Sequence, residues 1–533
     1  MTRVPQEGKH APGSRDQGRA GSLLLVAFMR CVEGCSPRLA ARDRMALQLL
    51  PTLTARALRF EPLAVGLLAA LLYAASGARD VLWGDPSKLA LATHDLVFSL
   101  SPENHLGSIL WARLFALLPL EPYALRTHLS SAAASGIAFG LGHSILLGMG
   151  IRHRSARIGI AAAVVCHTIW SVSCITESYG PALAVLALAA WLASSKPRPF
   201  WAGLTLGAGT LVHVICVFSA PALLYACRRD RAGPSGALRA AFGVALGCAL
   251  PVLAAALLAP PGTGGAQFSW VEVTLRHADW RLPAHNAPLL LGYLVYNFVG
   301  PALLLVSLGL HRMSSQQRTT ALLLAGAHYA VALLWMPQRS YLIPVPVYFA
   351  CALPISLGAE SLFERSAGRL RGTRAAWCTL LATVATPILV YSLTPWLVAR
   401  LPVQPGIRDV PYRRELPYFF QPWKCGESSA RAYIEDLKAV LPEGALVVGD
   451  FSTLTPLWYA QRVEGWRKDL SLYSVDQQPM DGIEGRVRGA FGRGRRVFVL
   501  DEETFRRLPR GSELGKRVAV ESVEQLSELE RIR

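Results

Sequence analysis

The stretch WGDPSKLALATHDLVFSLSPENHLGSILWARLFALLPLEPYALR, from Trp83 to Arg126, is the part of the first half of the chain that lacks the composition of a membrane span. One apolar run precedes it, at about 60–78, and many follow it. Asp85 comes soon after the first run, and His105 follows a proline that suits the start of a helix. A long polar loop folded against a bundle of spans is where we expect the chemistry of this protein.

The composition is that of a membrane protein. Of the 533 residues, 52% are hydrophobic and 17% are charged, whereas soluble domains carry about 25% charged residues. The net charge of +18 comes with many Arg residues in short loops between apolar runs, which is the positive-inside pattern. We therefore expect no nucleic-acid partner. Among the ten Cys, Cys31 and Cys35 form a lone pair without a second pair, so no zinc site is expected.

Further apolar runs predict spans at about 124–149, 155–172, 178–194, 200–212, 213–226, 238–259, 289–310, 319–336, 340–360 and 375–397. The run 200–226 is too long for one span and short for two. If it is a hairpin, all the basic loops fall on the side of the N-terminus, as the positive-inside rule requires. The sequence thus predicts about eleven spans in an inner or plasma membrane, with the N-terminus inside and the C-terminus outside.

This topology divides the chain into three parts. Residues 1–55 are expected to be a flexible cytoplasmic N-terminus, and 56–398 a transmembrane domain with an outer loop at 80–123. Residues 399–533 are expected to form a small extracytoplasmic α/β domain, because short buried-strand patterns at 445–449, 470–475 and 496–500 alternate with helical ones. Asp450 and Asp501 follow strands directly, where they would either bind a ligand or cap the next helix.

Two carboxylates are candidates for catalysis. Asp85, in Gly84-Asp85-Pro86, suits a catalytic base or metal ligand, but it could equally cap the helix that follows. Glu177 lies in a turn between two apolar helices, where a carboxylate near membrane depth is functional by default. The alternative for Glu177 is that it faces water in a short turn.

Other polar residues are candidates for substrate binding. His213 lies within an apolar run, either as a substrate contact or as a hydrogen-bonded structural histidine. Arg339 and Tyr341 stand at the start of a span on the expected outer face. An arginine there suits a phosphate through its bidentate fork, or it anchors the interface. Arg113 and Arg126 admit the same two interpretations.

Several segments together carry a family resemblance. They are WGDPSKLALATHDLVFSL (83–100), NHLGSILWARLFALLPLEPYALRTHLSSAAASGIAFGL (104–141), SVSCITESYGPALAV (171–185), GLTLGAGTLVHVICVFSAPALLY (203–225), PQRSYLIPVPVYFACALPI (337–355), VPYRRELPYFFQPW (410–423) and PEGALVVGDFSTLTPLWYAQRVEGWRKDLSLYSV (442–475). They resemble a multi-pass membrane family long described as a domain of unknown function, with a eukaryotic relative that is a protein O-mannosyltransferase. That family resembles the GT-C class of glycosyltransferases, which use polyprenyl-phosphate sugar donors and an acidic residue of the first outer loop as base.

The resemblance implies roles for individual residues. It makes Asp85 the catalytic base, and it matches Glu177 to the acidic position of the second outer turn. It matches His213 to the histidine of the broken hairpin and Arg339 to a donor-phosphate contact. The substrate-binding set is then His105, His213, Arg339 and Tyr341. The chain departs from the family at Lys88, where an acidic residue is frequent, and at His105-Leu106-Gly107, where a His-Pro-Pro-Gly-like run is common.

The sequence therefore predicts an integral-membrane glycosyltransferase of the cell envelope. It would move a sugar, with mannose one candidate, from a polyprenyl-phosphate carrier to a protein or glycan acceptor on the outer face. The lipid-linked sugar is the expected donor, membrane lipid is a further partner, and a divalent metal is compatible with the reaction. Two alternatives remain: a transporter or flippase of a lipid-linked sugar, since broken helices fit one, and a non-catalytic assembly protein.

Overall fold

The structure is a computed structural model that describes residues 60–96, 105–194, 197–229, 233–258, 279–335, 340–366, 372–401, 410, 412–476 and 480–500. The chain divides into two units, Met1–Glu61 and Pro62–Arg533. The helices and strands described here lie in the second unit, except that helix α3 begins with Glu61. Residues 1–55, for which the sequence predicts a flexible N-terminus, lie outside the described residues, as do Arg339 and Asp501.

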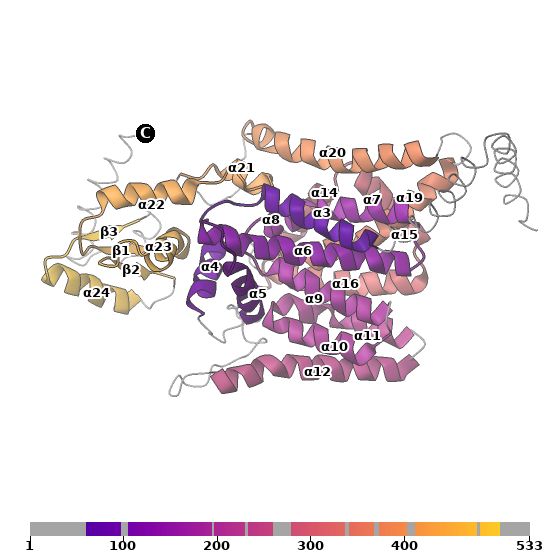
Figure 1. Ribbon diagram of the computed structural model, residues 1–533, viewed down its shortest axis with the longest axis horizontal. Helices are drawn as coiled ribbons and strands as arrows, with labels where there is room; N and C mark the ends of the chain where they lie inside the picture. Colours follow the sequence, from indigo (N-terminus) through magenta and orange to yellow (C-terminus); the bar gives the residue numbers. More distant parts are fainter. Residues whose placement is uncertain are drawn as a thin grey trace, which may run out of the picture. The chain divides into compact units, whose positions relative to one another are not determined.

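The first part of the second unit is helical throughout (Figure 1). Its helices are α3 (Glu61–Ser76), α4 (Asp85–Asp95), α5 (Leu106–Ala116), α6 (Tyr123–Gly148), α7 (His153–Val164), α8 (His167–Ser173), α9 (Tyr179–Ser194), α10 (Pro199–Ala208), α11 (Ala220–Arg229), α12 (Gly233–Leu258), α14 (Pro283–Asn297), α15 (Pro301–Arg312), α16 (Ser315–Leu334), α18 (Val345–Ala350), α19 (Ala352–Ser366) and α20 (Gly372–Val398). Two 3₁₀ turns, η2 (Gly209–Leu211) and η3 (Val214–Ser219), join α10 to α11.

Several of these helices have the dimensions of membrane spans. Within the described residues, three segments are long and apolar enough to cross: Tyr123–Gly148, Val345–Arg365 and Arg374–Val398. Two bent pairs raise the number to five if each counts as one span, namely α7 with α8, bent by 67°, and α14 with α15, bent by 102°. The multi-span class is therefore confirmed, while the count of about eleven stays a prediction.

The run 199–229 reverses direction, as the hairpin interpretation requires. Gly203 lies against Ala240 and Gly207 against Val244, so α10 and α12 run parallel. Helix α11 lies between them in sequence and also contacts α12 (Figure 1). Because α10 and α12 run in the same direction, the segment between them, which includes α11, must run back in the opposite direction. The glycines permit this contact, because a Cβ on Gly203 would stand 2.0 Å from the carbonyl oxygen of Ala240.

Small residues also allow close packing of antiparallel helices. Gly309 of α15 lies against Pro354 of α19, and Gly358 of α19 lies against Leu305 of α15. A Cβ on Gly309 would stand only 1.7 Å from the carbonyl oxygen of Pro354. Such small-residue contacts are typical of helices that pack within a membrane, where close van der Waals contact replaces the hydrophobic effect.

The tail after α20 is the predicted small α/β region. Three parallel strands, β1 (Leu446–Gly449), β2 (Ser471–Ser474) and β3 (Val497–Val499), form a sheet of order β2-β1-β3. The sheet lies between helix α24 (Met480–Gly492) on one face and helices α22 (Ser429–Val440) and α23 (Phe451–Val463) on the other (Figure 1). A short helix, α21 (Glu415–Phe420), precedes this region. The strands fall where the alternating apolar pattern predicts them.

The fold class predicted from sequence, a helical membrane bundle followed by a small α/β region, is thus confirmed. Helix α20 ends at Val398, the residue at which the sequence predicts the tail to separate from the bundle. The side of the membrane on which the tail lies, and the domain boundaries themselves, stay predictions. Asp450 caps α23 by accepting a hydrogen bond from the Thr453 amide at 2.8 Å, which is the capping interpretation of that residue.

Candidate functional site

The loop that follows α3 is held by the tail. The indole of Trp83 donates to Ser429 Oγ at 2.7 Å, and the amide of Gly84 donates to Thr455 Oγ1 at 2.9 Å. Further along, the amide of Ala124 donates to the hydroxyl of Tyr459 at 3.0 Å. Trp83 and Ala124 also share one apolar core with the tail. The tail therefore packs on both ends of the 83–126 stretch and fixes its backbone.

Asp85 is the first residue of α4, and Gly84 occupies the capping position with φ 72°. The N-cap residue of α4 is therefore Gly84, and the interpretation of Asp85 as the N-cap is wrong. Asp85 is half-buried, and the preceding residue is bonded to Thr455 of α23. Lys88, one turn further along α4, places its ammonium 5.6 Å from the ring centre of Phe451. The candidate base thus stands where the loop meets the tail.

Asp80 has a structural role at the same junction. Its carboxylate accepts two hydrogen bonds from Arg431 of α22, at 2.9 and 2.8 Å. Arg431 also pairs with Glu464, at 2.8 Å from Nη1. Burial alone would raise the pKa of Asp80, but the hydrogen bonds from Arg431 and from the Val81 amide outweigh it and lower the pKa below 3.8. Sequence reasoning missed Arg431, which is 351 residues from Asp80 in the chain.

The turn that carries Glu177 is tied to the start of the loop. The amide of Ala78 donates to the carbonyl of Cys174 at 2.9 Å. The buried ring of His128 joins the carbonyl oxygen of Asp80, at 3.0 Å, to the hydroxyl of Thr176, at 2.7 Å. Ser131 of α6 bonds the amide and the carbonyl of Glu177, each at 3.0 Å. The backbone of this turn is therefore rigidly placed beside the 80–83 segment.

Two of the predicted substrate-binding residues meet. The rings of His105 and His213 stack with their centres 4.6 Å apart, and Tyr179 lies 4.7 Å from His213. Nδ1 of His213 accepts a hydrogen bond from the Ile215 amide at 3.0 Å. In the neutral ring the proton then stands on Nε2, which is left as a donor. Gly107 allows the start of α5 to lie against Val212, the residue before His213, because a Cβ on Gly107 would stand 2.8 Å from a methyl group of Val212.

Tyr341 lies in a different group of residues. Its ring stacks on Tyr293 at 4.7 Å and meets Phe419 of α21 at 5.9 Å. Arg339, the other candidate at the start of this span, lies outside the described residues.

The segment that leads into the tail brings Tyr418 near Glu177 and Lys424 near Cys174. Burial raises the pKa of Tyr418 to about 12, and the carboxylates around it, including that of Glu177, add to the rise. Lys424 is buried and donates to the carbonyls of Tyr418 and Gln421, at 2.8 and 2.5 Å. Burial lowers the pKa of Lys424 to about 8. The sequence singles out neither residue.

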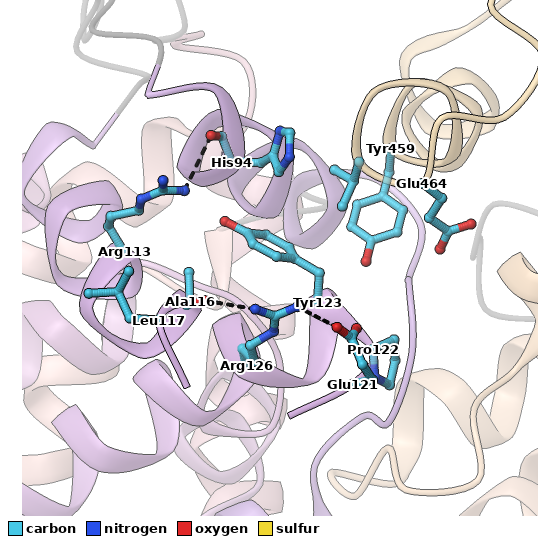
Figure 2. Close-up of a pocket in the computed structure, with 11 residues that line it drawn as sticks. His94, Arg113, Ala116, Leu117, Glu121, Pro122, Tyr123, Arg126, Tyr459 and Glu464 are labelled. Carbon is cyan, nitrogen blue, oxygen red and sulfur yellow. Dashed lines mark hydrogen bonds and ion pairs between the residues drawn. The ribbon is translucent and has the colours of Figure 1, made fainter. Parts of the chain in front are cut away.

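A cavity of about 490 Å³ opens between the loop and α23. Figure 2 shows Tyr123 near its centre, with the hydroxyl directed to the side of Arg113 and with the guanidinium of Arg126 beneath the ring. Within the described residues, no group of three metal-ligating side chains includes Asp85 or Glu177. A divalent metal therefore stays a prediction from the sequence, and the described residues give no set of ligands for it at Asp85 or Glu177.

The comparisons with known proteins identify the fold. No family model matches the chain, and no curated protein matches it in sequence. ArnT from Cupriavidus metallidurans in the apo state aligns with a TM-score of 0.50 and 15% identity, over 79% of this chain and 90% of that chain. The same protein bound to undecaprenyl phosphate aligns with a TM-score of 0.49 and 13% identity, over 78% and 89%. The chain is an integral multi-pass membrane protein with an ArnT-like fold.

Proposed function

We propose that this protein is a glycosyltransferase that moves a sugar from a polyprenyl-phosphate carrier to an acceptor at the outer face of the membrane. The fold carries the proposal, because the alignment with apo ArnT covers 79% of this chain and 90% of that chain. The resemblance of the loop sequence to the GT-C class supports it independently. Mannose, and a protein or glycan acceptor, stay predictions from the sequence alone.

Asp85 is the proposed base. It would take the proton from an acceptor hydroxyl, whose oxygen attacks the anomeric carbon of the sugar while the bond to the carrier phosphate breaks. The phosphate leaves with the bonding electron pair. A base must be held in place to act in this way, and the bond between Gly84 and Thr455 fixes the backbone beside Asp85.

Glu177, His105 and His213 are proposed to position the substrates. The stacked histidines offer the Nε2 proton of His213 to a sugar or phosphate oxygen. Glu177, whose backbone is held by Ser131, offers a carboxylate to a sugar hydroxyl or to the acceptor. Arg339 remains a proposed contact of the donor phosphate, and Tyr341 a proposed contact of the substrate.

The experiment is transfer from a panel of polyprenyl-phosphate sugars by the purified full-length protein, with mass detection of the product. Asp85→Asn removes the base and keeps the size of the side chain. We expect a loss of at least about a hundredfold in rate, the lower range for general-base catalysis. Asp436→Asn, an exposed residue of α22, is the matched control and is expected to leave the rate unchanged. Equal rates in wild type and Asp85→Asn would refute the role of Asp85.

The bend of 102° between α14 and α15 favours one other function. Broken helices are a common feature of transporters, in which their ends face the solute. A transporter of a lipid-linked sugar would move labelled donor across vesicles without forming a product. Uptake without transfer in the same panel would support this alternative over the enzyme.

A further inference from the structure

The cavity between the loop and α23 is separate from the candidate base. Its lining residues come from three places: the end of α4 (His94), the α5–α6 corner (Arg113, Ala116, Leu117, Glu121, Pro122, Tyr123, Arg126) and α23 with the residue that follows it (Tyr459, Val463, Glu464). His94 stands nine residues after Asp85 on the same helix, or roughly 13 Å along its axis at about 1.5 Å per residue. The cavity therefore belongs to the opposite end of α4.

Two hydrogen-bond donors on its wall are buried. The Nε of Arg126 has no partner among the described residues, and the hydroxyl of Tyr123 lies beside the side chain of Arg113. The other nitrogens of Arg126 are engaged, with Nη1 on the carbonyl of Ala116 at 2.8 Å and Nη2 on Glu121 at 2.9 Å. Buried donors are normally hydrogen-bonded, so both side chains suit a ligand group that accepts hydrogen bonds.

The charge of the wall favours an anion. Arg113 donates to the carbonyls of Thr93 and His94, both at 3.3 Å, lies beside the hydroxyl of Tyr123, and meets no described carboxylate. The carboxylate facing Arg126 is that of Glu121, whose side chain is 81% exposed and can be exchanged for another acceptor. Glu464, the other acid of the wall, is held by Arg431. Two arginines thus face the cavity against one loosely held carboxylate.

The side chains are also fixed before any ligand binds. The guanidinium of Arg126 lies 5.0 Å from the ring centre of Tyr123, and the ring of His94 meets that of Tyr123 edge-on at 5.4 Å. His94 is in turn bonded to Asp95 at 2.9 Å, and Asp95 pairs with Arg462 of α23 at 2.8 Å. Pre-organised donors lose less entropy on binding than mobile ones. The fixed side chains of this cavity therefore suit the binding of a specific ligand better than a mobile ion pair on the surface would.

We propose that this cavity binds an oxyanion, a phosphate or carboxylate group carried by a sugar-sized ligand, through Arg113, Arg126 and the hydroxyl of Tyr123. The volume of about 490 Å³ lies within the usual range for small-molecule sites, about 300–1,000 Å³. Planar guanidinium groups recognise phosphate and carboxylate alike through paired hydrogen bonds. Because α23 forms one wall, an occupied site also strengthens the contact between the tail and the loop. This binding does not depend on the proposed sugar transfer.

The test is calorimetric titration of the purified full-length protein with four probes: inorganic phosphate, glucose 6-phosphate, glucuronate and glucose. We expect the two anionic sugars to bind and glucose, which lacks the anion, to fail. Tighter binding of glucose 6-phosphate than of glucuronate assigns a phosphate, and the reverse order assigns a carboxylate. Binding of inorganic phosphate alone, without either anionic sugar, would overturn the sugar-sized ligand. No binding of any anion would overturn the site.

Variants locate the binding. Tyr123→Phe removes only the hydroxyl and keeps the ring contacts with Arg126 and His94, so we expect the fold to be retained. We expect about tenfold weaker binding for the loss of one bond to a charged group. Arg113→Gln and Arg126→Gln are expected to weaken it at least as much. Arg486→Gln is the matched control, since Arg486 also lies over a tyrosine, 4.6 Å from the ring centre of Tyr473, on the tail surface. Equal weakening by Arg486→Gln, or unchanged affinity in Tyr123→Phe and Arg113→Gln, would refute the assignment.

Discussion

The ion pair between Asp80 and Arg431 leads to a quantitative prediction for the docking of the tail. Its two hydrogen bonds are 2.9 and 2.8 Å long, and the side chains are 25% and 23% exposed. A hydrogen bond to a charged group contributes about 1.5–3 kcal/mol. Arg431 keeps Glu464 as a partner when Asp80 is changed. We therefore expect Asp80→Asn to weaken docking by about 2 kcal/mol, or roughly 30-fold in the docking equilibrium.

Hydrogen exchange measures this loss at two amides that cross the interface. The amide of Gly84 donates to Thr455, and the amide of Ala124 donates to Tyr459. If both exchange when the tail lifts, Asp80→Asn accelerates both by the same factor of roughly 30, because exchange follows the population of the open state. Agreement between two amides 40 residues apart would show that the whole contact opens.

A control variant separates docking from local charge. Glu435 also faces Arg431, at 3.7 Å, but both residues belong to α22. Glu435→Gln should change exchange at Gly84 and Ala124 by less than about threefold, since pairs within one helix contribute at most about 0.5 kcal/mol. If Asp80→Asn leaves both amides as protected as in wild type, or acts no more strongly than Glu435→Gln, the inference that this ion pair holds the tail is refuted.

Three further predictions follow from packing and titration. Gly309→Ala should lower the midpoint of thermal unfolding, because its Cβ would stand 1.7 Å from the carbonyl oxygen of Pro354 and overpacking costs about 1–3 kcal/mol. Gly326→Ala is the control and should not lower the midpoint, since a Cβ there would meet nothing within 4 Å. Equal effects of the two variants would contradict the packing of α15 on α19. The pKa of Asp80 is held below 3.8, so its contribution to docking is present above pH 3.8 and is lost as the pH falls through the lowered pKa. In that acidic range the amide of Gly84 should lose its protection against exchange. The loss should be much smaller in Asp80→Asn. Burial lowers the pKa of Lys424 from 10.5 to about 8, so between these pH values the unfolded chain binds more protons than the folded one. Lys424 should therefore make a contribution to the free energy of unfolding that rises with pH in this range. If the unfolding midpoint of Lys424→Gln depends on pH with the same slope as that of wild type, this prediction is wrong.

Local patterns in the sequence predicted the tail well. The apolar runs at 445–449, 470–475 and 496–500 become the three strands, because short buried runs between turns have few other stable arrangements. In helix α22, Ala430, Tyr433, Ile434 and Leu437 repeat at helical spacing and form its buried face. The hairpin at 200–226 was predicted from the placement of basic loops, and the parallel contact of α10 with α12 agrees with it.

The junction of loop and tail was beyond sequence reasoning. Arg431 and Tyr459 carry no local signal of the partners they meet, Asp80 and Ala124, more than 300 residues earlier. Periodicity reports which face of a helix is buried, but it does not report what covers that face. The same limit applies to the stacked pair of His105 and His213, which sequence reasoning proposed separately and the fold brings to 4.6 Å.

Arg113 and Arg126 were open to two interpretations, phosphate contact or interfacial anchor, since an arginine near the end of a span suits both. In the structure both arginines line one cavity together with Tyr123 (Figure 2), and the choice between the two interpretations stays a prediction. Asp80, just past the first apolar run, pairs with Arg431 of the tail. The structural role of Asp80 follows from the position of its partner arginine, 351 residues later in the chain.

The central claim is that Asp85 activates an acceptor for sugar transfer. The most direct measurement is the single-turnover rate of transfer from a polyprenyl-phosphate sugar that the wild-type protein uses, compared between wild type, Asp85→Asn and Asp436→Asn. We predict that Asp436→Asn transfers at the wild-type rate and that Asp85→Asn still binds the donor but transfers at least about a hundredfold more slowly. Transfer by Asp85→Asn at the wild-type rate would contradict the claim.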